Sequence, residues 1–453
     1  MTNPGVASAA DSIESRFRAR TKKSRELAQR ASSVFPDGVG RAGMPNELYP
    51  VFVDRASGQY LYDVDGNRLL DMSNGHSALP LGHSPAPVVA AIANQLARGI
   101  GFFLMEEGEI RLAEMLRQRV PSMEKIRFTA SGTEATMFAV RAARAFTGRK
   151  LFARAEGSYH GMHDMMCSGM GMNVGTPWMD SGDNPVSNGV LPSVREGVVF
   201  LPFNDIEASR KVIAAHAADL AAVIIEPMLG GGGGIPAERE YLLALRELCD
   251  RHKIVLILDE MVTIGLARGG AQEYFGVRAD LTTTGKLVGG GMPMGVFGGR
   301  ADIMSLMNRD ASGVLRMFHT GTWNGHPLAM AAGIAQLEML TPEKFAYLGE
   351  LGETMRKKVR ALATEMRVAV QVTGVQHFSA FHYTPQPVRN RRDALRANPK
   401  LSSRVSFSLL SQGFYMLGQR TNLSTAITHQ DIDEFISALA VAFEEAGAAG
   451  TAA

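Results

Sequence analysis

The sequence predicts an α/β fold, with a mainly parallel sheet covered by helices on both faces and a smaller α+β unit. From about residue 85 the chain alternates between helical and strand-like patterns. The strand-like runs at 151–153, 198–201, 221–225 and 254–258 are short and almost entirely apolar, as is typical of strands buried on both faces. After residue 330 this alternation gives way to a long helix and several short strands.

The N-terminal part is expected to form a helix and a hairpin. Residues 13–31 have a helical pattern, and the segment FPDGVG that follows ends the helix. Two apolar runs, 60–64 and 68–72, flank Asp65-Gly66-Asn67, and Asp-Gly between apolar runs is a strong hairpin signal. The chain therefore divides into an N-terminal segment over 1–80, a large domain over 81–330 and a C-terminal small domain over 331–453.

The remaining elements follow from apolar spacing and from helix-end signals. Gly148 is a typical stop for the helix before it, and Thr428 begins a capping-box-like start of the last helix. We expect helices at 108–120, 133–147, 238–251, 343–366 and from 428 through 443, and further strands at 126–129, 281–284, 368–373, 378–383, 414–417 and 423–427.

Composition excludes several classes of protein. The 453 residues include 47 Lys and Arg against 45 Asp and Glu, so the net charge of +2 gives no global attraction to nucleic acid or anionic membranes. The two cysteines, Cys167 and Cys249, indicate no disulfide framework. No apolar run reaches the roughly 20 residues of a membrane span, and the first residues lack a signal core. We expect a cytoplasmic protein without a nucleic-acid or membrane partner.

Polar groups follow several predicted strands at the point where each strand ends. In open α/β sheets, ligands bind beyond the carboxyl ends of the strands, so these groups are expected to meet at one edge. They are Ser131-Gly132-Thr133-Glu134, Glu226-Pro227, Asp259-Glu260 and Gly285-Lys286.

Each group alone has two interpretations. Ser131-Gly132-Thr133 begins a helix, where free N–H groups favour a phosphate, although an ordinary N-cap has the same pattern. Asp259 either caps the next helix or faces a buried cation. Lys286, among apolar residues and glycines, is either a nucleophile with a lowered pKa or an exposed loop lysine.

One cofactor requires all three groups together. Pyridoxal phosphate needs an anion cradle, an acid at its pyridine nitrogen and a lysine for the Schiff base. Other motifs fit less well: a P-loop would need Gly at position 280, where Asp stands, and no third ligand cluster supports a metal site at His160 and His163. We therefore expect pyridoxal 5'-phosphate and no metal.

Longer motifs carry a specific resemblance from about residue 30 to 445. The chain resembles class III (subgroup II) pyridoxal-phosphate aminotransferases, in the branch of glutamate-1-semialdehyde aminomutase and the β-amino-acid (β-phenylalanine type) aminotransferases. The motifs are YLYDVDGNRLLD, RFTASGTEATMFAVRAARAFTGR, EGSYHG, IIEP, LILDEM, DLTTTGKLVGGGMPMGVFGGR and HTGTWNGHPLAMAAG.

The resemblance implies fold type I, with a seven-stranded large-domain sheet and a small domain built from both chain ends. It also implies a homodimer with two shared active sites. The roles that it carries over are Lys286 as the Schiff-base lysine, Asp259 as the acid on the pyridine nitrogen, Ser131, Gly132 and Thr133 as the phosphate loop, Tyr159 as the ring-stacking residue with His160 beside it, Glu226 on the ring's hydroxyl side, and Thr322 reaching the neighbouring subunit's phosphate.

Departures from the family pattern bear on the substrate. Met261 replaces the usual Val and is expected to pack on the ring less rigidly. The aminomutase usually has a glutamate-bearing loop before its last strand, whereas residues 416–422 are shorter and contain no acid. Arg420 resembles the arginine with which β-amino-acid aminotransferases bind a substrate carboxylate, and Arg41 matches an arginine at the substrate mouth. Phe102-Phe103 are expected to line an apolar substrate pocket or to lie in the core.

The resulting functional expectation is a transaminase. It would move the amino group of an amino acid, preferably a β-amino acid, to a keto acid such as 2-oxoglutarate or pyruvate. The first alternative is glutamate-1-semialdehyde 2,1-aminomutase, which the glycine-rich segment after Lys286 favours. An alternative of another class is a non-catalytic protein that binds a phosphate ligand.

Overall fold

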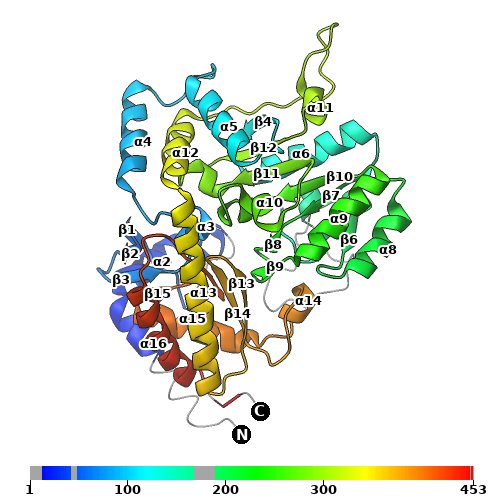
Figure 1. Cartoon of the computed structure of the whole chain (residues 1–453). Helices are drawn as coiled ribbons and strands as arrows, with labels where there is room; N and C mark the ends of the chain where they lie inside the picture. Colours follow the sequence, from blue (N-terminus) through cyan, green and yellow to red (C-terminus); the bar gives the residue numbers. More distant parts are fainter. Residues whose placement is uncertain (1–12, 42–47, 168–188, 449, 452–453) are drawn as a thin grey trace.

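The computed structural model describes residues 13–41, 48–167, 189–448 and 450–451. Figure 1 shows a large sheet with its helices in the upper half of the molecule, and smaller sheets with long helices in the lower half. The predicted α/β fold class is confirmed.

A seven-stranded sheet forms the large part, in the order β4-β12-β11-β10-β7-β5-β6. The strand β12 pairs antiparallel with both of its neighbours, and the remaining neighbours pair in parallel. The strands are β4 (Lys125–Thr129), β12 (Gly295–Gly299), β11 (Leu281–Gly285), β10 (Val255–Asp259), β7 (Leu220–Ile225), β5 (Leu151–Ala155) and β6 (Val198–Leu201).

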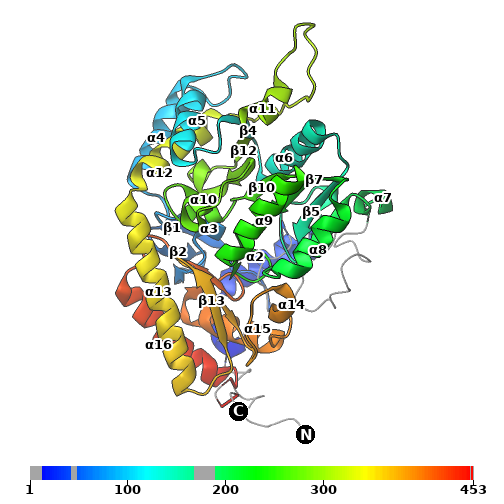
Figure 2. The same ribbon diagram turned by 45° about the vertical axis from the view of Figure 1, so that its right-hand side comes forward.

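Helices cover both faces of this sheet, because alternate residues of its central strands are apolar on both sides. On β7, Val223 and Ile225 pack in one cluster with α8 (Ile206–His216) and α9 (Arg239–His252). Ala222 and Ile224 pack on the other face with α6 (Gly132–Thr147). Figure 2 shows α8 and α9 side by side in front of the sheet. Further helices of this part are α4 (Ala86–Arg98), α5 (Glu107–Arg119), α7 (Pro192–Arg195), α10 (Gly270–Phe275), α11 (Ala301–Met304) and α12 (Pro327–Met339).

The N-terminal segment contains the predicted hairpin but not the single predicted helix. Strands β2 (Tyr60–Asp63) and β3 (Arg68–Asp71) pair antiparallel, with β1 (Val53–Ser57) and β15 (Phe414–Tyr415) on either side. The expected helix over 13–31 is interrupted at Thr21, and a second helix, α2 (Lys22–Ser32), begins there. Asp65 in the hairpin turn accepts the N–H groups of Lys23 and Ser24, so the hairpin caps the new helix.

The C-terminal part contains three long helices and a three-stranded sheet. The helices are α13 (Pro342–Glu365), α15 (Pro399–Gln412) and α16 (His429–Glu445), and the capping box at Thr428 and Asp431 is present. The sheet has the order β13-β14-β16, with β13 (Gln371–Val375), β14 (Phe378–His382) and β16 (Arg420–Asn422). The predicted strand at 423–427 is wrong, because the last strand lies at 420–422 and ends before those residues.

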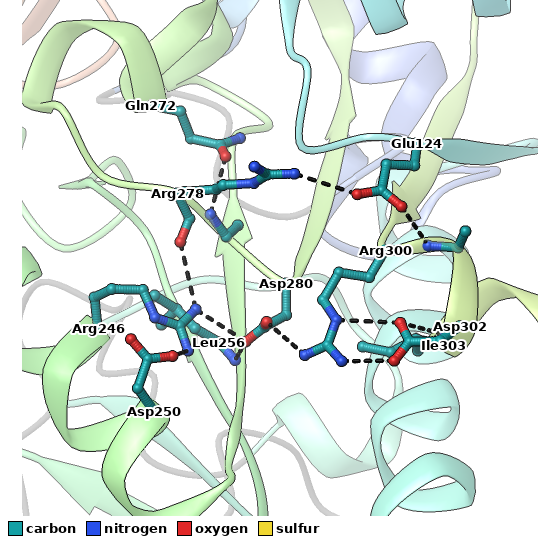
Figure 3. A network of polar contacts seen from close by, with 12 residues as sticks. Glu124, Arg246, Asp250, Leu256, Gln272, Arg278, Asp280, Arg300, Asp302 and Ile303 are labelled. Carbon is teal, nitrogen blue, oxygen red and sulfur yellow. Dashed lines mark hydrogen bonds and ion pairs between the residues drawn. The ribbon is translucent and has the colours of Figure 1, made fainter.

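Asp280 organises the edge of the large sheet opposite the predicted site. Its carboxylate accepts hydrogen bonds from Arg246, Arg300 and the N–H of Leu256, at 2.8 to 3.0 Å (Figure 3). Glu124 and Arg278 extend this network (Figure 3). The aspartate that excludes a P-loop therefore joins the starts of β10 and β11.

No helix within the described ranges is both long and apolar enough to cross a membrane.

Candidate active site

The predicted site residues of β10 and β11 come together at the carboxyl edge of the large sheet. Asp259 is the last residue of β10 and pairs in register with Thr283 of β11. Lys286 follows the end of β11 and is partly buried. Its φ of +44° places it in the left-handed region, which is uncommon for a residue with a side chain and typical of constrained functional positions.

Asp259 contacts His160 directly. The Nδ1 of His160 lies 2.7 Å from Oδ2 of Asp259, and both side chains are fully enclosed. Burial lowers the pKa of His160, although its hydrogen bond to Asp259 acts in the opposite direction. The neutral ring therefore donates its Nδ1 proton to the carboxylate, while Nε2 has no partner among the described residues.

Glu226, at the end of β7, is held by backbone N–H groups. It accepts the N–H of Tyr159 at 2.7 Å and that of Gly230 at 3.0 Å. Burial, together with the nearby Asp259, raises the pKa of Glu226 to about 8. Tyr159 and His160 thus connect to two different acidic residues, each at the end of its own strand.

The phosphate-loop residues begin α6. Ser131 is the N-cap, and its hydroxyl accepts the N–H of Glu134 at 3.3 Å, so the N-cap interpretation holds for this side chain. The N–H groups of Gly132 and Thr133 donate to no group of the described residues, which leaves them available to an anion at the helix N-terminus. Capping and anion binding are therefore compatible here.

Met261 lies between the helix start and the lysine. A Cβ added at Gly132 would stand 2.7 Å from the sulfur of Met261, and one added at Gly285 would stand 3.0 Å from it. The side chain consequently fills the space between the two segments that would hold the phosphate and the reactive carbon of a cofactor. Contact between Met261 and the cofactor ring stays a prediction.

Burial lowers the pKa of Lys286, and the cation Arg420 acts in the same direction, while Asp259 and Glu226 oppose the shift. A lysine in such surroundings is more readily deprotonated, and the free amine is the form that attacks a carbonyl carbon. The nucleophile interpretation therefore fits the structure better than an exposed loop lysine.

Arg420 is the first residue of β16 and reaches the same site from the small part. Its Nη1 donates to the carbonyl of Gly230, which links it to the turn beside Glu226. Burial lowers the pKa of Arg420, and the negative charge of Glu226 acts against this shift. The guanidinium is thus held next to Glu226, and within the described part of the chain its other N–H donors bond no group.

The glycine run 230–234 is a functional segment that sequence reasoning set aside. It joins β8 (Met228–Leu229) to β9 (Ile235–Pro236) in a tight turn. A Cβ on Gly232 would stand 2.6 Å from the carbonyl of Gly157, and one on Gly234 would stand 2.8 Å from Ala380. The absence of side chains lets this turn fit between the Tyr159 segment and the strand of Arg420; five consecutive glycines were the available signal.

A second missed segment is the left-handed turn Asn74–Ser77. All four of its residues have φ between +47° and +71°. Asn74 donates to the carbonyl of Asn422, two residues beyond Arg420, and Gln336 bridges the carbonyls of Ala78 and Leu287, beside Lys286. Desolvation of its ring lowers the pKa of His76 to about 3, and the nearby cations Arg420, Lys286 and Arg41 act in the same direction.

The other sequence-predicted residues lie toward the surface. Arg41 is exposed, and its charge contributes to the lowered pKa of His76. Thr322 is exposed, beside Trp323, of which 60% is exposed. Phe102 and Phe103 are 41% and 85% exposed, so the alternative that places them in the core is wrong.

These residues fit pyridoxal phosphate. The site offers two free N–H groups at a helix start for the phosphate, a buried carboxylate for the ring nitrogen and a lysine whose pKa is lowered by burial. Together with the seven-stranded sheet, this arrangement defines a pyridoxal-phosphate enzyme of fold type I.

Comparisons with known proteins support the assignment to the pyridoxal-phosphate enzymes. The family model described as aminotransferase class-III matches residues 43–442. The chain is 39% identical over 395 residues to a glutamate-1-semialdehyde 2,1-aminomutase of Methanothermobacter thermautotrophicus, covering 87% of this chain and 91% of that protein. A β-phenylalanine aminotransferase of Variovorax paradoxus superposes with a TM-score of 0.87 at 32% identity, covering 98% of each chain. A transaminase with pyridoxal phosphate bound superposes with a TM-score of 0.86 at 34% identity, covering 94% of this chain and 98% of that one.

The protein belongs to the class-III aminotransferase family. It is an enzyme, and its cofactor is pyridoxal phosphate. The alternative of a non-catalytic phosphate-binding protein is therefore not supported.

Proposed function

We propose that the protein is a transaminase that takes the amino group of a β-amino acid and delivers it to a keto acid such as 2-oxoglutarate or pyruvate. The observation that carries this proposal is the position of Arg420, held by Gly230 beside Glu226 and near Lys286. A planar guanidinium binds a carboxylate through two parallel hydrogen bonds. Both the donor and the acceptor of such a reaction carry carboxylates.

Bound pyridoxal phosphate supplies a ring that stabilises negative charge at the carbon from which a proton leaves. Asp259 would hold the ring nitrogen, and the N–H groups of Gly132 and Thr133 would bind the phosphate. Tyr159 would cover one face of the ring, and Glu226 would face its hydroxyl side. His160 donates to Asp259 and fixes the orientation of that carboxylate.

Lys286 would bind the reactive carbon of the cofactor until a substrate amine displaces it. Its freed amino group would then take the proton from the donor carbon and return it on the cofactor side. The lowered pKa of Lys286 keeps a larger share of this amine unprotonated at neutral pH. Arg420 would hold the carboxylate that orients the donor carbon toward this amine, and Arg41 would bind a carboxylate at the mouth.

We propose a homodimer with shared active sites. Thr322 would reach the phosphate of the neighbouring subunit, and its exposed neighbour Trp323 would lie in the interface. A Cβ on Gly101 would stand 3.7 Å from Trp323, so the exposed apolar side chains of the adjoining segment would extend the same surface. They are Phe102, Phe103, Leu104 and Met105. Such a contiguous apolar surface is typical of a subunit interface.

A second candidate is the aminomutase reaction, which the name of the 39% identical relative favours. The absence of an acid in residues 416–422 and the presence of Arg420 favour the transaminase. Turnover with a β-amino acid, measured with and without added keto acid, separates the two. A transaminase stops after one turnover per site without keto acid, whereas sustained turnover of glutamate-1-semialdehyde without keto acid would overturn the proposal.

A further inference from the structure

Arg154 of β5 is a fully buried arginine that the proposed reaction does not use. Its exposed fraction is 0%, and its guanidinium donates to three neutral oxygens. The bonds run from Nη1 to the carbonyl of Met166 at 2.8 Å, from Nε to the hydroxyl of Ser158 at 3.1 Å, and from Nη2 to the carbonyl of Ser158. Within the described residues its hydrogen bonds all go to neutral atoms and none goes to a carboxylate, although buried charges are normally paired.

The charge of Arg154 acts on acidic groups that lie farther away. Burial lowers its pKa to about 10, while Glu226, Cys167 and Asp259 act to raise it. The guanidinium therefore remains protonated at neutral pH. Arg154 pairs in register with Ile224 of β7, two residues before Glu226, and its charge acts on Glu226 and Asp259 in a dry environment.

We propose that Arg154 is a positioning residue of the cofactor site, which fixes the segment carrying Tyr159 and His160 and keeps the His160–Asp259 pair as neutral imidazole and carboxylate. This inference rests on the proposed role of Asp259 at the ring nitrogen. An ionised Asp259 holds a protonated ring nitrogen, which is the state in which the ring withdraws electrons.

The fixing of the segment follows from the hydrogen bonds. One guanidinium binds Ser158, immediately before Tyr159, and Met166, at the far end of the segment. Between these two points, Thr136 donates to the carbonyl of His160 at 2.6 Å, and the hydroxyl of Thr133 accepts the N–H of Met162 at 3.2 Å. The start of α6 and the end of β5 thus hold the same segment from two sides.

The charge effect on His160 follows from the groups around its ring. The exclusion of water disfavours the protonated ring, Asp259 favours it, and Arg154 disfavours it, so the pKa of His160 is lowered. Removing the charge of Arg154 would raise this pKa and admit a proton at a higher pH. The titratable and charged groups that face this region are Asp259 of β10, Arg154 of β5, Glu226 after β7, Lys286 after β11, and Tyr159, His163 and Cys167 of its own segment.

The test is the dissociation constant of pyridoxal phosphate from the full-length apo-protein, titrated between pH 5.5 and 8.5, for Arg154→Met and Arg154→Lys. We expect Arg154→Met to bind at least about tenfold more weakly than wild type, and we expect the ratio of the two dissociation constants to grow toward acid pH. Arg154→Lys keeps the positive charge but loses the several hydrogen bonds of the guanidinium. It should therefore bind pyridoxal phosphate more weakly than wild type by a factor that does not depend on pH. Arg117→Met, at an exposed arginine, is the matched control and should behave as wild type.

An Arg154→Met protein with the pH profile of wild type would overturn the charge role. Equal losses in the Met and Lys variants at every pH would also overturn it. If Arg154→Met does not fold, Arg154→Lys still tests the charge role. A loss of cofactor affinity that grows toward acid pH in this variant, which keeps the charge, would contradict the inference. Asp259→Asn in the same titration distinguishes a failure of the role of Arg154 from a failure of the role of Asp259. If Asp259→Asn leaves the cofactor affinity and its pH profile unchanged, the proposed role of Asp259 at the ring nitrogen is wrong.

Discussion

At the scale of single residues, the contact between His160 and Asp259 shows how burial determines the protonation state of a hydrogen-bonded pair. The two residues are 99 positions apart in the sequence and meet at 2.7 Å in a region without solvent. Because burial lowers the pKa of His160, the proton stays on Nδ1 of a neutral ring and the carboxylate keeps its charge. The motifs pointed to both residues, but no sequence pattern indicates that they touch, since the contact depends on how β10 and the segment after β5 are placed.

Arg420 gives the most direct prediction about the substrate. We expect Arg420→Gln to raise KM for a β-amino-acid donor by about 10- to 100-fold, because a charge-assisted bond to the carboxylate is lost. Steady-state kinetics with the β-amino acid and with an amine that lacks a carboxylate measure this effect.

The amine without a carboxylate is the internal control, and Arg117→Gln at an exposed arginine is the matched protein control. If Arg420→Gln weakened both substrates equally, Arg420 would act on the fold of the site and not on the carboxylate.

At the scale of elements, the sequence predicted the strands whose burial is continuous. The strands β5, β6, β7 and β10 and the hairpin were located within one or two residues of their bounds. The strand β12 was missed because its sequence, GVFGG, has the composition of a loop. A Cβ on Gly295 would stand 2.2 Å from the carbonyl of Ser131, and one on Gly299 would stand 2.1 Å from that of Asp280. These glycines allow close approach, which a single sequence does not distinguish from turn formation.

The glycine run 230–234 was likewise not recognised as part of the site. It matched no phosphate-binding motif, and its role is to leave room for Gly157, Ala380 and Arg420. That requirement belongs to segments far away in the chain. The predicted strand at 423–427 failed for a related reason, since the pairing with β14 ends at Asn422, whose N–H donates to the carbonyl of Met72 in the N-terminal part.

Gly234 tests the crowding around this turn. Gly234 has φ of +65°, and a Cβ there would meet Ala380 at 2.8 Å, so Gly234→Ala should combine backbone strain with a steric clash. We expect a loss of about 1–3 kcal/mol in the free energy of unfolding, measured by denaturant titration, and a raised KM because Arg420 lies beside the turn.

Gly418→Ala is the matched control. Gly418 has φ of +61° and nothing within 4 Å of an added Cβ, so this variant carries the backbone strain alone. Equal losses in the two variants would show that crowding at Gly234 has no part in the effect.

At the scale of the whole molecule, the site lies where the large and small parts meet. Two bidentate pairs cross this boundary beside it, Arg392 with Glu156 at 2.7 Å and Arg389 with Glu238 at 2.8 and 2.9 Å. Glu156 is three residues before Tyr159, so the small part contacts the segment that would cover the cofactor. Such a boundary depends on the complete fold and is not visible in any local pattern.

The proposed dimer predicts an effect of Trp323. We expect Trp323→Asp to shift the protein toward single chains in size-exclusion chromatography with light scattering, because a charge would enter an apolar interface. Activity should fall with dimer content, since Thr322 would serve the neighbouring site. Val441→Asp, at an exposed position of α16, should change neither the size nor the activity. A wild type that is a single chain with full activity would contradict the shared site.

Buried histidines predict how stability depends on pH. Burial lowers the pKa of His377 to about 3, whereas the unfolded chain has a value near 6.5. The folded protein therefore excludes a proton that the unfolded chain binds, and the free energy of unfolding falls as pH drops from about 6.5 toward 3. His377→Gln should reduce this slope by up to about 1.4 kcal/mol per pH unit, as measured by urea unfolding between pH 6.5 and 4.5.

Wild-type protein in the same titration provides the comparison. An unchanged slope in His377→Gln would mean that His377 takes up its proton without unfolding.

We expect Lys286 to bind the cofactor at the edge of the sheet formed by β10 and β11. Reduction of the purified protein with borohydride, followed by peptide mapping, tests this claim most directly, because reduction fixes the cofactor to the amine that holds it. We predict that the label is found on Lys286 and that Lys286→Ala carries no label. A label on another lysine, or a Lys286→Ala protein that is still labelled, would show that Lys286 does not hold the cofactor.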